Sequence, residues 1–264
     1  MLDKLVCSNI SLSFKKLTLS IDFLELDKGF IYSIIGPNGT GKSTLLNILL
    51  GNRSHKSWEL NGFENTAYVP SDVECLDNFN RKEITRLFQR SNKKFDKALF
   101  INYLFTFKLS GFDDYEDLSK GEKKCVLLSL ALASQPKVLV LDELSNGVDI
   151  HSRSLIYICI MDYIGTSDNT VIYASNQVED VLPITDYFLF MGSGKVSSPI
   201  SVVDIIEKYK VINLSLDDFQ SYAGKIYSYD QNFRTVKAIV DRKVGDDKSD
   251  SAELITILGG GISV

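Results

Sequence analysis

The segment GPNGTGKS at residues 36–43 constrains the fold most, because it matches the pattern GxxxxGK(S/T) between two apolar stretches. Residues 30–35 read as a strand buried on both faces, and residues 45–50 read as a helix. In this arrangement the backbone N–H groups of the loop cradle phosphate oxygens at the start of the helix. The order strand, glycine loop, helix predicts an α/β fold that binds ATP and Mg²⁺. The loop residues expected to contact the nucleotide are Gly36, Asn38, Gly39, Gly41, Lys42, Ser43 and Thr44.

Within this loop, Lys42 is expected to reach the β- and γ-phosphates, and Ser43 to place its hydroxyl on Mg²⁺. The dinucleotide-binding pattern GxGxxG does not fit, because Thr44 stands where its third glycine belongs.

A second buried strand, VLVLDE at residues 138–143, ends in two acidic residues. Asp142 is expected to hold Mg²⁺, and Glu143 to orient and deprotonate the attacking water. Alone, two acids after an apolar run also fit a strand end that enters solvent. The phosphate-binding loop upstream favours the catalytic interpretation.

Between these motifs, the segment LSKGE at residues 118–122 precedes an apolar helix. Ser119 and Gly121 at a helix N-terminus fit an anion-binding site. The same residues fit a helix cap, in which Ser119 and Glu122 satisfy each other's backbone N–H groups. The two interpretations are compatible.

Together, the loop, LSKGE, VLVLDE and SNGVD at 145–149 resemble the ATPases of ABC transporters in order and spacing, over about residues 4–195. The resemblance implies a head-to-tail dimer, in which Ser119 and Gly121 contact a nucleotide bound by a second subunit. It identifies 145–149 as the D-loop, with Asp149 near the nucleotide. It also places Phe14 against the adenine, although Phe14 equally fits a core position.

Two residues depart from the family pattern. Ser71 stands near Mg²⁺ where the family usually carries a glutamine, and Asn176 stands where a histidine contacts the γ-phosphate. Asparagine donates only a neutral hydrogen bond, whereas a histidine is able to carry positive charge. We therefore expect near-normal ATP binding and slow hydrolysis, with Lys42, Glu143 and Asn176 as the catalytic residues.

The expected fold class is α/β: a P-loop NTPase core with a mainly parallel sheet, an antiparallel β subdomain, a helical subdomain and a small C-terminal α+β appendage. The ATPase domain should span residues 1–196, with the helical subdomain at about 72–118, and the appendage residues 197–264. In the β subdomain, the apolar residues of 17–23 alternate with polar ones. Residues 244–253 read as an exposed acidic loop.

Composition limits the class of protein. The net charge of −5 argues against nucleic acid as a partner, and no apolar stretch reaches the ~18 residues of a membrane-spanning helix. The N-terminal residues lack the layout of a signal peptide, so a cytoplasmic location is expected. The four cysteines are widely spaced and expected to be buried or half-buried free thiols: Cys7, Cys75, Cys125 and Cys159.

The resemblance implies a subunit that energises an ABC transporter from the inner face of the cell membrane. Its expected partners are transmembrane permease subunits and a second ATPase subunit, identical or paralogous. The short β segment after Gly51 and the appendage favour an exporter of peptides, lipids or antibiotics. Two alternatives stay open: a nucleotide-gated regulatory subunit with little turnover, or an ABC ATPase that acts on a cytosolic protein.

Overall fold

The computed structural model describes residues 4–14, 17–54, 57–165, 168–215, 226–231, 235–241, 254–255 and 257. No helix among these residues is long and apolar enough to cross a membrane. The expected acidic loop at 244–253 lies outside the described residues.

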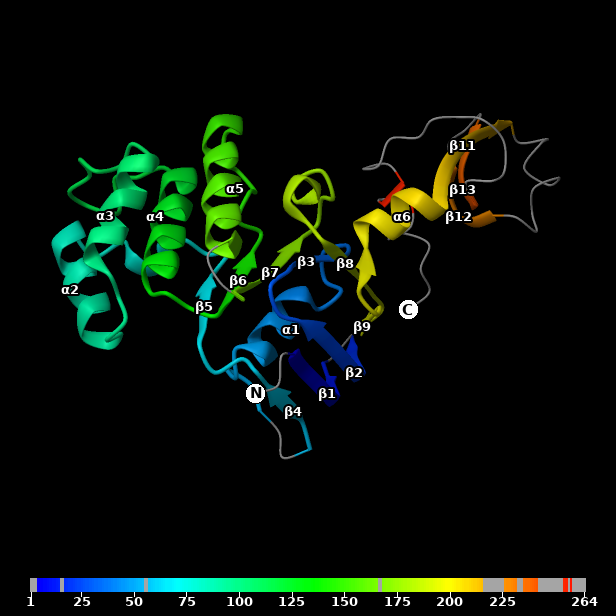
Figure 1. Cartoon of the computed structure of the whole chain (residues 1–264), viewed down its shortest axis with the longest axis horizontal. Coiled ribbons are helices and arrows are strands. Elements are labelled where there is room, and N and C mark those ends of the chain that lie inside the picture. Colours follow the sequence, from blue (N-terminus) through cyan, green and yellow to red (C-terminus); the bar gives the residue numbers. More distant parts are fainter. Residues whose placement is uncertain are drawn as a thin grey trace.

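A sheet of ten strands forms the centre of the chain, in the order β4-β1-β2-β9-β8-β3-β7-β6-β5, with β10 paired to β8 (Figure 1). Neighbouring strands are parallel in the part of the sheet that runs β8-β3-β7-β6-β5. Strand β1, in contrast, pairs antiparallel with β2 and β4. The strands of the sheet are β1 (Lys4–Ser13), β2 (Thr18–Asp27), β3 (Ile31–Ile35), β4 (Glu59–Asn61), β5 (Thr66–Val69), β6 (Val138–Asp142), β7 (Thr170–Ser175), β8 (Tyr187–Gly192), β9 (Lys195–Val196) and β10 (Ile200–Ser201).

Every residue of β3, β6 and β7 is buried, because helices or strands cover both faces of the sheet. Helix α1 (Lys42–Leu49) packs with β1 and β2 against one face. Helices α4 (Lys120–Ala133) and α5 (Ile150–Gly165) pack against the other face. Short 3₁₀ turns lie at Glu74–Leu76 and Leu182–Ile184.

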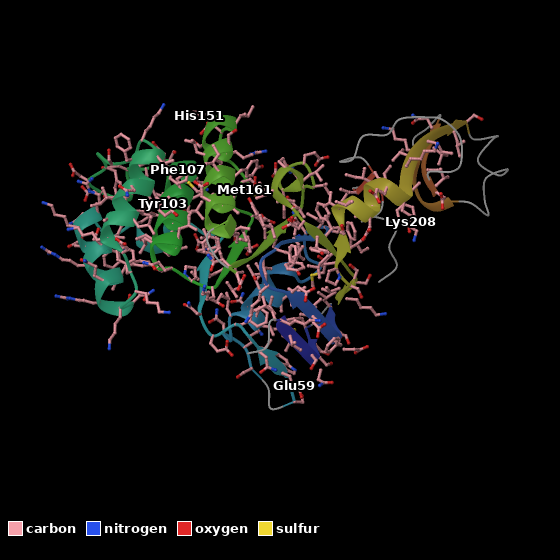
Figure 2. All side chains as sticks on the ribbon, viewed as in Figure 1. Glu59, Tyr103, Phe107, His151, Met161 and Lys208 are labelled. Atoms are coloured by element: carbon pink, nitrogen blue, oxygen red, sulfur yellow. The ribbon has the colours of Figure 1, made fainter. Side chains whose placement is uncertain are left out.

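Helices α2 (Arg81–Ser91) and α3 (Lys97–Thr106) lie beside α4, at the end of the molecule away from the C-terminal strands (Figure 1). Asn80 and Glu83 form the expected capping box at the start of α2: Glu83 N donates to Asn80 Oδ1 at 3.0 Å and Asn80 N to Glu83 Oε2 at 2.9 Å. In Figure 2, Tyr103 and Phe107 lie on this helical part of the molecule. The fold thus has the mainly parallel core and the helices that the sequence predicts.

At the other end, helix α6 (Val202–Lys208) leads into a small sheet of order β11-β13-β12 (Figure 1). Its strands are β11 (Tyr209–Ser215), β12 (Ile226–Gln231) and β13 (Thr235–Asp241). Ile205 and Val211 join the main apolar core, so these elements pack onto the rest of the fold. Because β10 at 200–201 still pairs with β8, the main sheet extends past residue 196, and the domain boundary placed there stays a prediction.

Two expectations about individual residues are wrong. The apolar alternation predicted at 17–23 ends at Phe23, which is 65% exposed, while Ile21 and Leu24 are both buried. The alternation shifts by one residue near Asn9 of the neighbouring strand, whose φ of 58° is left-handed. Cys75 is exposed, because it lies in the 3₁₀ turn after β5; Cys7, Cys125 and Cys159 are buried free thiols as predicted.

Candidate functional site

The loop at residues 36–43 connects β3 to α1 and surrounds a cavity of about 330 Å³. A Cβ on Gly36 would lie 2.3 Å from the carbonyl oxygen of Met191, so only glycine fits that position. Gly41 has a φ of 105° at the N-cap of α1, a conformation that glycine adopts at no steric cost. The cavity is lined by Phe14, Leu17, Asn38, Gly39, Gly41, Lys42, Ser43, Thr44 and Glu143.

Lys42 is buried inside this loop. Its Nζ donates hydrogen bonds to the carbonyl oxygens of Gly36 at 2.6 Å and Pro37 at 3.1 Å. Burial lowers the pKa of the ammonium, and the nearby carboxylates of Glu143 and Asp142 oppose that shift. The loop therefore holds a positive charge where phosphates would bind.

Asp142 lies at the carboxyl end of β6, beside the loop. Its Oδ2 accepts hydrogen bonds from Tyr68 at 3.4 Å and Ser71 at 3.5 Å, whereas Oδ1 is buried with no hydrogen-bond partner among the described residues. Burial raises the pKa of this carboxyl, and hydrogen bonding from Ser43 and Tyr68 opposes the rise. A buried oxygen without a partner, next to two hydroxyls, is the donor set that Mg²⁺ prefers. The residues that would hold Mg²⁺ are thus Asp142, Ser43 and Ser71.

Glu143 follows directly and lines the cavity with a half-buried side chain. Its φ of 48° is left-handed, which costs a non-glycine residue about 1–2 kcal/mol. Two hydrogen bonds to its backbone groups hold this conformation: Glu143 N donates to Ala174 O at 2.9 Å, and the side-chain Nζ of Lys124 donates to Glu143 O at 2.7 Å. Strain fixed in this way is common where a side chain must be presented to a substrate.

Asn176 reaches the loop from the end of β7. Its Nδ2 lies 3.5 Å from Oδ1 of Asn38, on the cavity wall. Of the two histidines, His151 lies at the outer end of α5 (Figure 2), and His55 is outside the described residues. The structure thus places the Asn176 amide beside the phosphate loop, and its contact with a γ-phosphate stays a prediction.

Phe14 lies on the cavity wall and is 37% exposed, so it is not a core residue. The guanidinium of Arg53 lies 5.5 Å from its ring centroid. An exposed ring beside the phosphate loop offers a face on which a base stacks. Its contact with adenine stays a prediction.

The residues of LSKGE and of the D-loop do not line this cavity. Ser119 caps α4 with the predicted capping box, in which Ser119 N donates to Glu122 Oε2 at 2.9 Å. A Cβ on Gly121 would lie 3.4 Å from Gly147 O, so the start of α4 lies against the segment at 145–149. Asp149 accepts hydrogen bonds from the backbone N–H groups of His151 and Ser152 at 3.0 Å each. A side-chain hydrogen bond with Ser152 is the largest cause that lowers the pKa of the Asp149 carboxyl, and the backbone hydrogen bonds from Ser152 and His151 lower it further.

Two residues of the site are absent from the sequence predictions. The hydroxyl of Tyr68 in β5 donates a hydrogen bond to Asp142, and the local sequence around Tyr68 does not predict this contact. Lys124 is buried in α4, where its Nζ donates to Glu143 O and to Asn146 O at 2.7 and 2.5 Å. The available signal is that Lys124 directly precedes the apolar run of α4, because a lysine that becomes buried there needs hydrogen-bond acceptors.

The family model of the ABC transporter domain matches residues 20–146. The chain is 29% identical over 217 residues to the tungstate uptake ATP-binding protein TupC of Peptoclostridium acidaminophilum, covering 73% of this chain and 96% of that protein. It is 33% identical over 170 residues to the zinc import ATP-binding protein ZnuC of Vibrio parahaemolyticus, covering 62% and 63% of the two.

Among solved structures, an ATP-binding subunit of an ABC transporter has the same fold. It superposes with a TM-score of 0.66 at 18% identity and covers 76% of this chain and 91% of that chain. The family match, the relatives, the fold and the site agree. The chain is therefore similar to the ATP-binding proteins of ABC transporters, and its residues 20–146 match the model of that family.

Proposed function

We propose that this chain hydrolyses ATP to energise an ABC transporter, bound to a transmembrane permease at the cytoplasmic face of the cell membrane. The observation that carries the proposal is that Lys42, Ser43 and Glu143 line one cavity at an edge of the sheet, with Asp142 hydrogen-bonded to Ser43 beside it. ATP hydrolysis needs a loop that binds the phosphates, a carboxylate that holds the metal ion and a general base.

In this mechanism the N–H groups of the loop and the Lys42 ammonium neutralise the phosphates of ATP. Bound Mg²⁺ would supply further positive charge at the β- and γ-phosphates. Glu143 accepts a proton from water while the water oxygen bonds to the γ-phosphorus and the bond to the bridging oxygen of ADP breaks. The rigid main chain at Glu143 fixes the direction of the carboxylate.

A second ATPase subunit completes the site in this proposal. Ser119, Gly121 and Asp149 lie outside the cavity of their own subunit, which supports a role at the nucleotide of another. The capping of Ser119 leaves the remaining N–H groups at the start of α4 free to serve a phosphate. ATP bound between two subunits would hold the dimer closed.

Hydrolysis is slow in this proposal, because Asn176 provides a neutral donor where a charged histidine would strengthen the contact. Ser71 reaches Asp142 at 3.5 Å but is much shorter than a glutamine. The same pair of residues favours the second candidate function, a regulatory subunit that binds ATP and dimerises with little turnover. The presence of Glu143, the expected general base, favours a subunit that hydrolyses ATP.

The direction of transport stays a prediction. Export was expected from the short segment between α1 and β5 and from the C-terminal elements. The two relatives described above carry the names of tungstate uptake and zinc import systems, which favours import instead.

Reconstitution tests the proposal. The chain is co-expressed with candidate permease subunits, chosen from any membrane proteins that are encoded near its gene, and a complex that forms is purified and placed in vesicles. ATP-dependent movement of solute into or out of the vesicles supports the proposed function and gives its direction. A chain that never co-purifies with the membrane subunit contradicts it.

A further inference from the structure

Lys124 is a buried cation in the second turn of α4 and is only 5% exposed. Its Nζ donates hydrogen bonds to Glu143 O at 2.7 Å and to Asn146 O at 2.5 Å. Among the residues that the structure describes, Lys124 has no carboxylate partner in an ion pair. A buried ammonium needs acceptors, and here the acceptors are two carbonyl groups of a single turn.

This turn, at residues 143–146, directly follows β6, and its first residue is the proposed general base. Asn146 N donates to Glu143 O at 3.2 Å, the hydrogen bond that closes a four-residue turn. Leu144 inside the turn is completely buried. Lys124 contacts the carbonyl group at each end of the turn, so one side chain connects its first residue with its last.

The other hydrogen bonds that hold the start of this turn come from β7. Glu143 N donates to Ala174 O at 2.9 Å, and Ser145 N donates to the hydroxyl oxygen of Tyr173 at 2.8 Å. These contacts hold the N–H groups of Glu143 and Ser145. Lys124 holds the carbonyl group of Glu143 instead, and it is the side chain that attaches this carbonyl to α4.

Glu143 needs such support because its backbone is left-handed, with a φ of 48°. A residue with a Cβ relaxes toward negative φ unless its surroundings hold the adjacent peptide groups. The peptide that follows Glu143 contains the carbonyl group that Lys124 holds, so loss of the lysine would free this peptide to rotate. Such a rotation would move the Glu143 carboxylate relative to the phosphate loop.

We propose that Lys124 is a positioning residue for ATP hydrolysis, an inference that rests on the proposed function. Its hydrogen bonds hold the turn in the conformation that presents the Glu143 carboxylate to the cavity. Lys124 itself does not line the cavity, so it acts through Glu143 and not on the nucleotide. A displacement of about 1 Å in a reacting group is able to lower a rate about a hundredfold, so even partial release of the turn should be measurable.

The test compares two substitutions at neighbouring buried lysines of α4. Lys124→Met removes the donors and keeps a long side chain that suits an apolar environment. Lys123→Met is the matched control, because Lys123 is 7% exposed and its Nζ pairs with Asp77 at 2.7 Å instead of with the turn. The kcat and the KM for ATP are measured on the complex described above, and urea unfolding verifies the fold of each variant.

Lys124→Met should lower kcat at least about tenfold and leave the KM for ATP within about twofold of wild type, because the phosphate loop is unchanged. Lys123→Met should keep kcat within about threefold. An unchanged kcat in Lys124→Met, or equal losses in the two variants, overturns the inference while the ATPase function stands.

Lys124→Gln separates hydrogen bonding from charge. Burial lowers the pKa of the Lys124 ammonium, and the carboxylates of Glu143, Asp142 and Asp180 oppose that shift, so its charge also interacts with the site. Glutamine keeps two N–H donors and carries no charge. Lys124→Gln should therefore recover kcat to within about threefold of wild type. A glutamine variant as slow as Lys124→Met overturns the inference, because the charge and not the hydrogen bonds would then be responsible.

A double-mutant cycle with Glu143→Gln tests whether Lys124 acts through Glu143. The residual rate of Glu143→Gln is measured in single turnovers of radiolabelled ATP, and adding Lys124→Met should not lower it further. A further tenfold fall shows that Lys124 acts independently of Glu143 and overturns the inference. If wild type does not hydrolyse ATP, or if Glu143→Gln alone hydrolyses it at the wild-type rate, the proposed function of the site fails together with the inference.

Discussion

Replacing Asn176 with histidine should accelerate ATP hydrolysis. The Asn176 amide lies 3.5 Å from Asn38 on the cavity wall, so a side chain at this position reaches the phosphate site. A neutral hydrogen bond contributes about 0.5–1.5 kcal/mol and a charge-assisted one about 1.5–3 kcal/mol. The difference of about 1–1.5 kcal/mol in the transition state corresponds to roughly a fivefold to tenfold increase in kcat.

The measurement is steady-state ATPase activity of the assembled complex between pH 6 and 8. Because imidazole is protonated below roughly pH 6.5, the ratio of the Asn176→His rate to the wild-type rate should grow as the pH falls. Gln177→His is the matched control, since it adds the same group one exposed position away. An Asn176→His rate equal to wild type, or equal to the control, refutes the explanation of slow hydrolysis.

Two further experiments test the candidate site, and a third tests a buried hydrogen bond elsewhere in the fold. Lys42→Ala removes the buried ammonium, so ATP affinity in equilibrium titration should fall roughly tenfold to a hundredfold; unchanged affinity contradicts its role. Mg²⁺ affinity, measured by calorimetry, should fall as the pH drops toward the raised pKa of Asp142, because the proton and the metal compete for one carboxyl. The variant Asp142→Asn should lose this pH dependence. Tyr115→Phe removes a buried hydrogen bond of 2.8 Å to Val73 O and should lower the free energy of unfolding in urea by about 1–2 kcal/mol; no change argues against that contact.

The pKa of Asp142 also determines how stability depends on pH without Mg²⁺. A carboxyl whose pKa is raised in the folded state holds its proton more tightly there than in the unfolded chain. Its contribution therefore favours folding at low pH and is lost as the pH rises through the raised pKa. Mg²⁺ opposes this trend, because it stabilises the charged form.

Local patterns in the sequence predicted the elements whose stabilising contacts are also local. The capping boxes at Asn80 and Ser119 involve residues three positions apart, and both are present. The exposure of Phe23 was not predictable in this way, because it depends on the left-handed Asn9 in the neighbouring strand. The exposure of Phe23 therefore depends on the pairing of the two strands rather than on the local pattern of apolar residues.

In the candidate site, too, features that depend on neighbouring residues were predictable from the sequence, and contacts between distant residues were not. The loop at 36–43 was recognisable because glycine positions and Lys42 follow from its short-range conformation. The role of Lys124 was not, because its acceptors, Glu143 O and Asn146 O, lie 19 and 22 residues away in the sequence. Tyr68 and Asp142 are 74 residues apart and meet only because β5 and β6 are neighbours in the sheet.

ATP turnover by the complex with Glu143→Gln tests the central claim most directly. The substitution removes the general base and keeps the size and position of the side chain in the cavity. We expect the wild-type complex to hydrolyse ATP slowly and the variant to lose at least about a hundredfold of that rate while still binding ATP. Hydrolysis by the variant at the wild-type rate would rule out Glu143 as the general base.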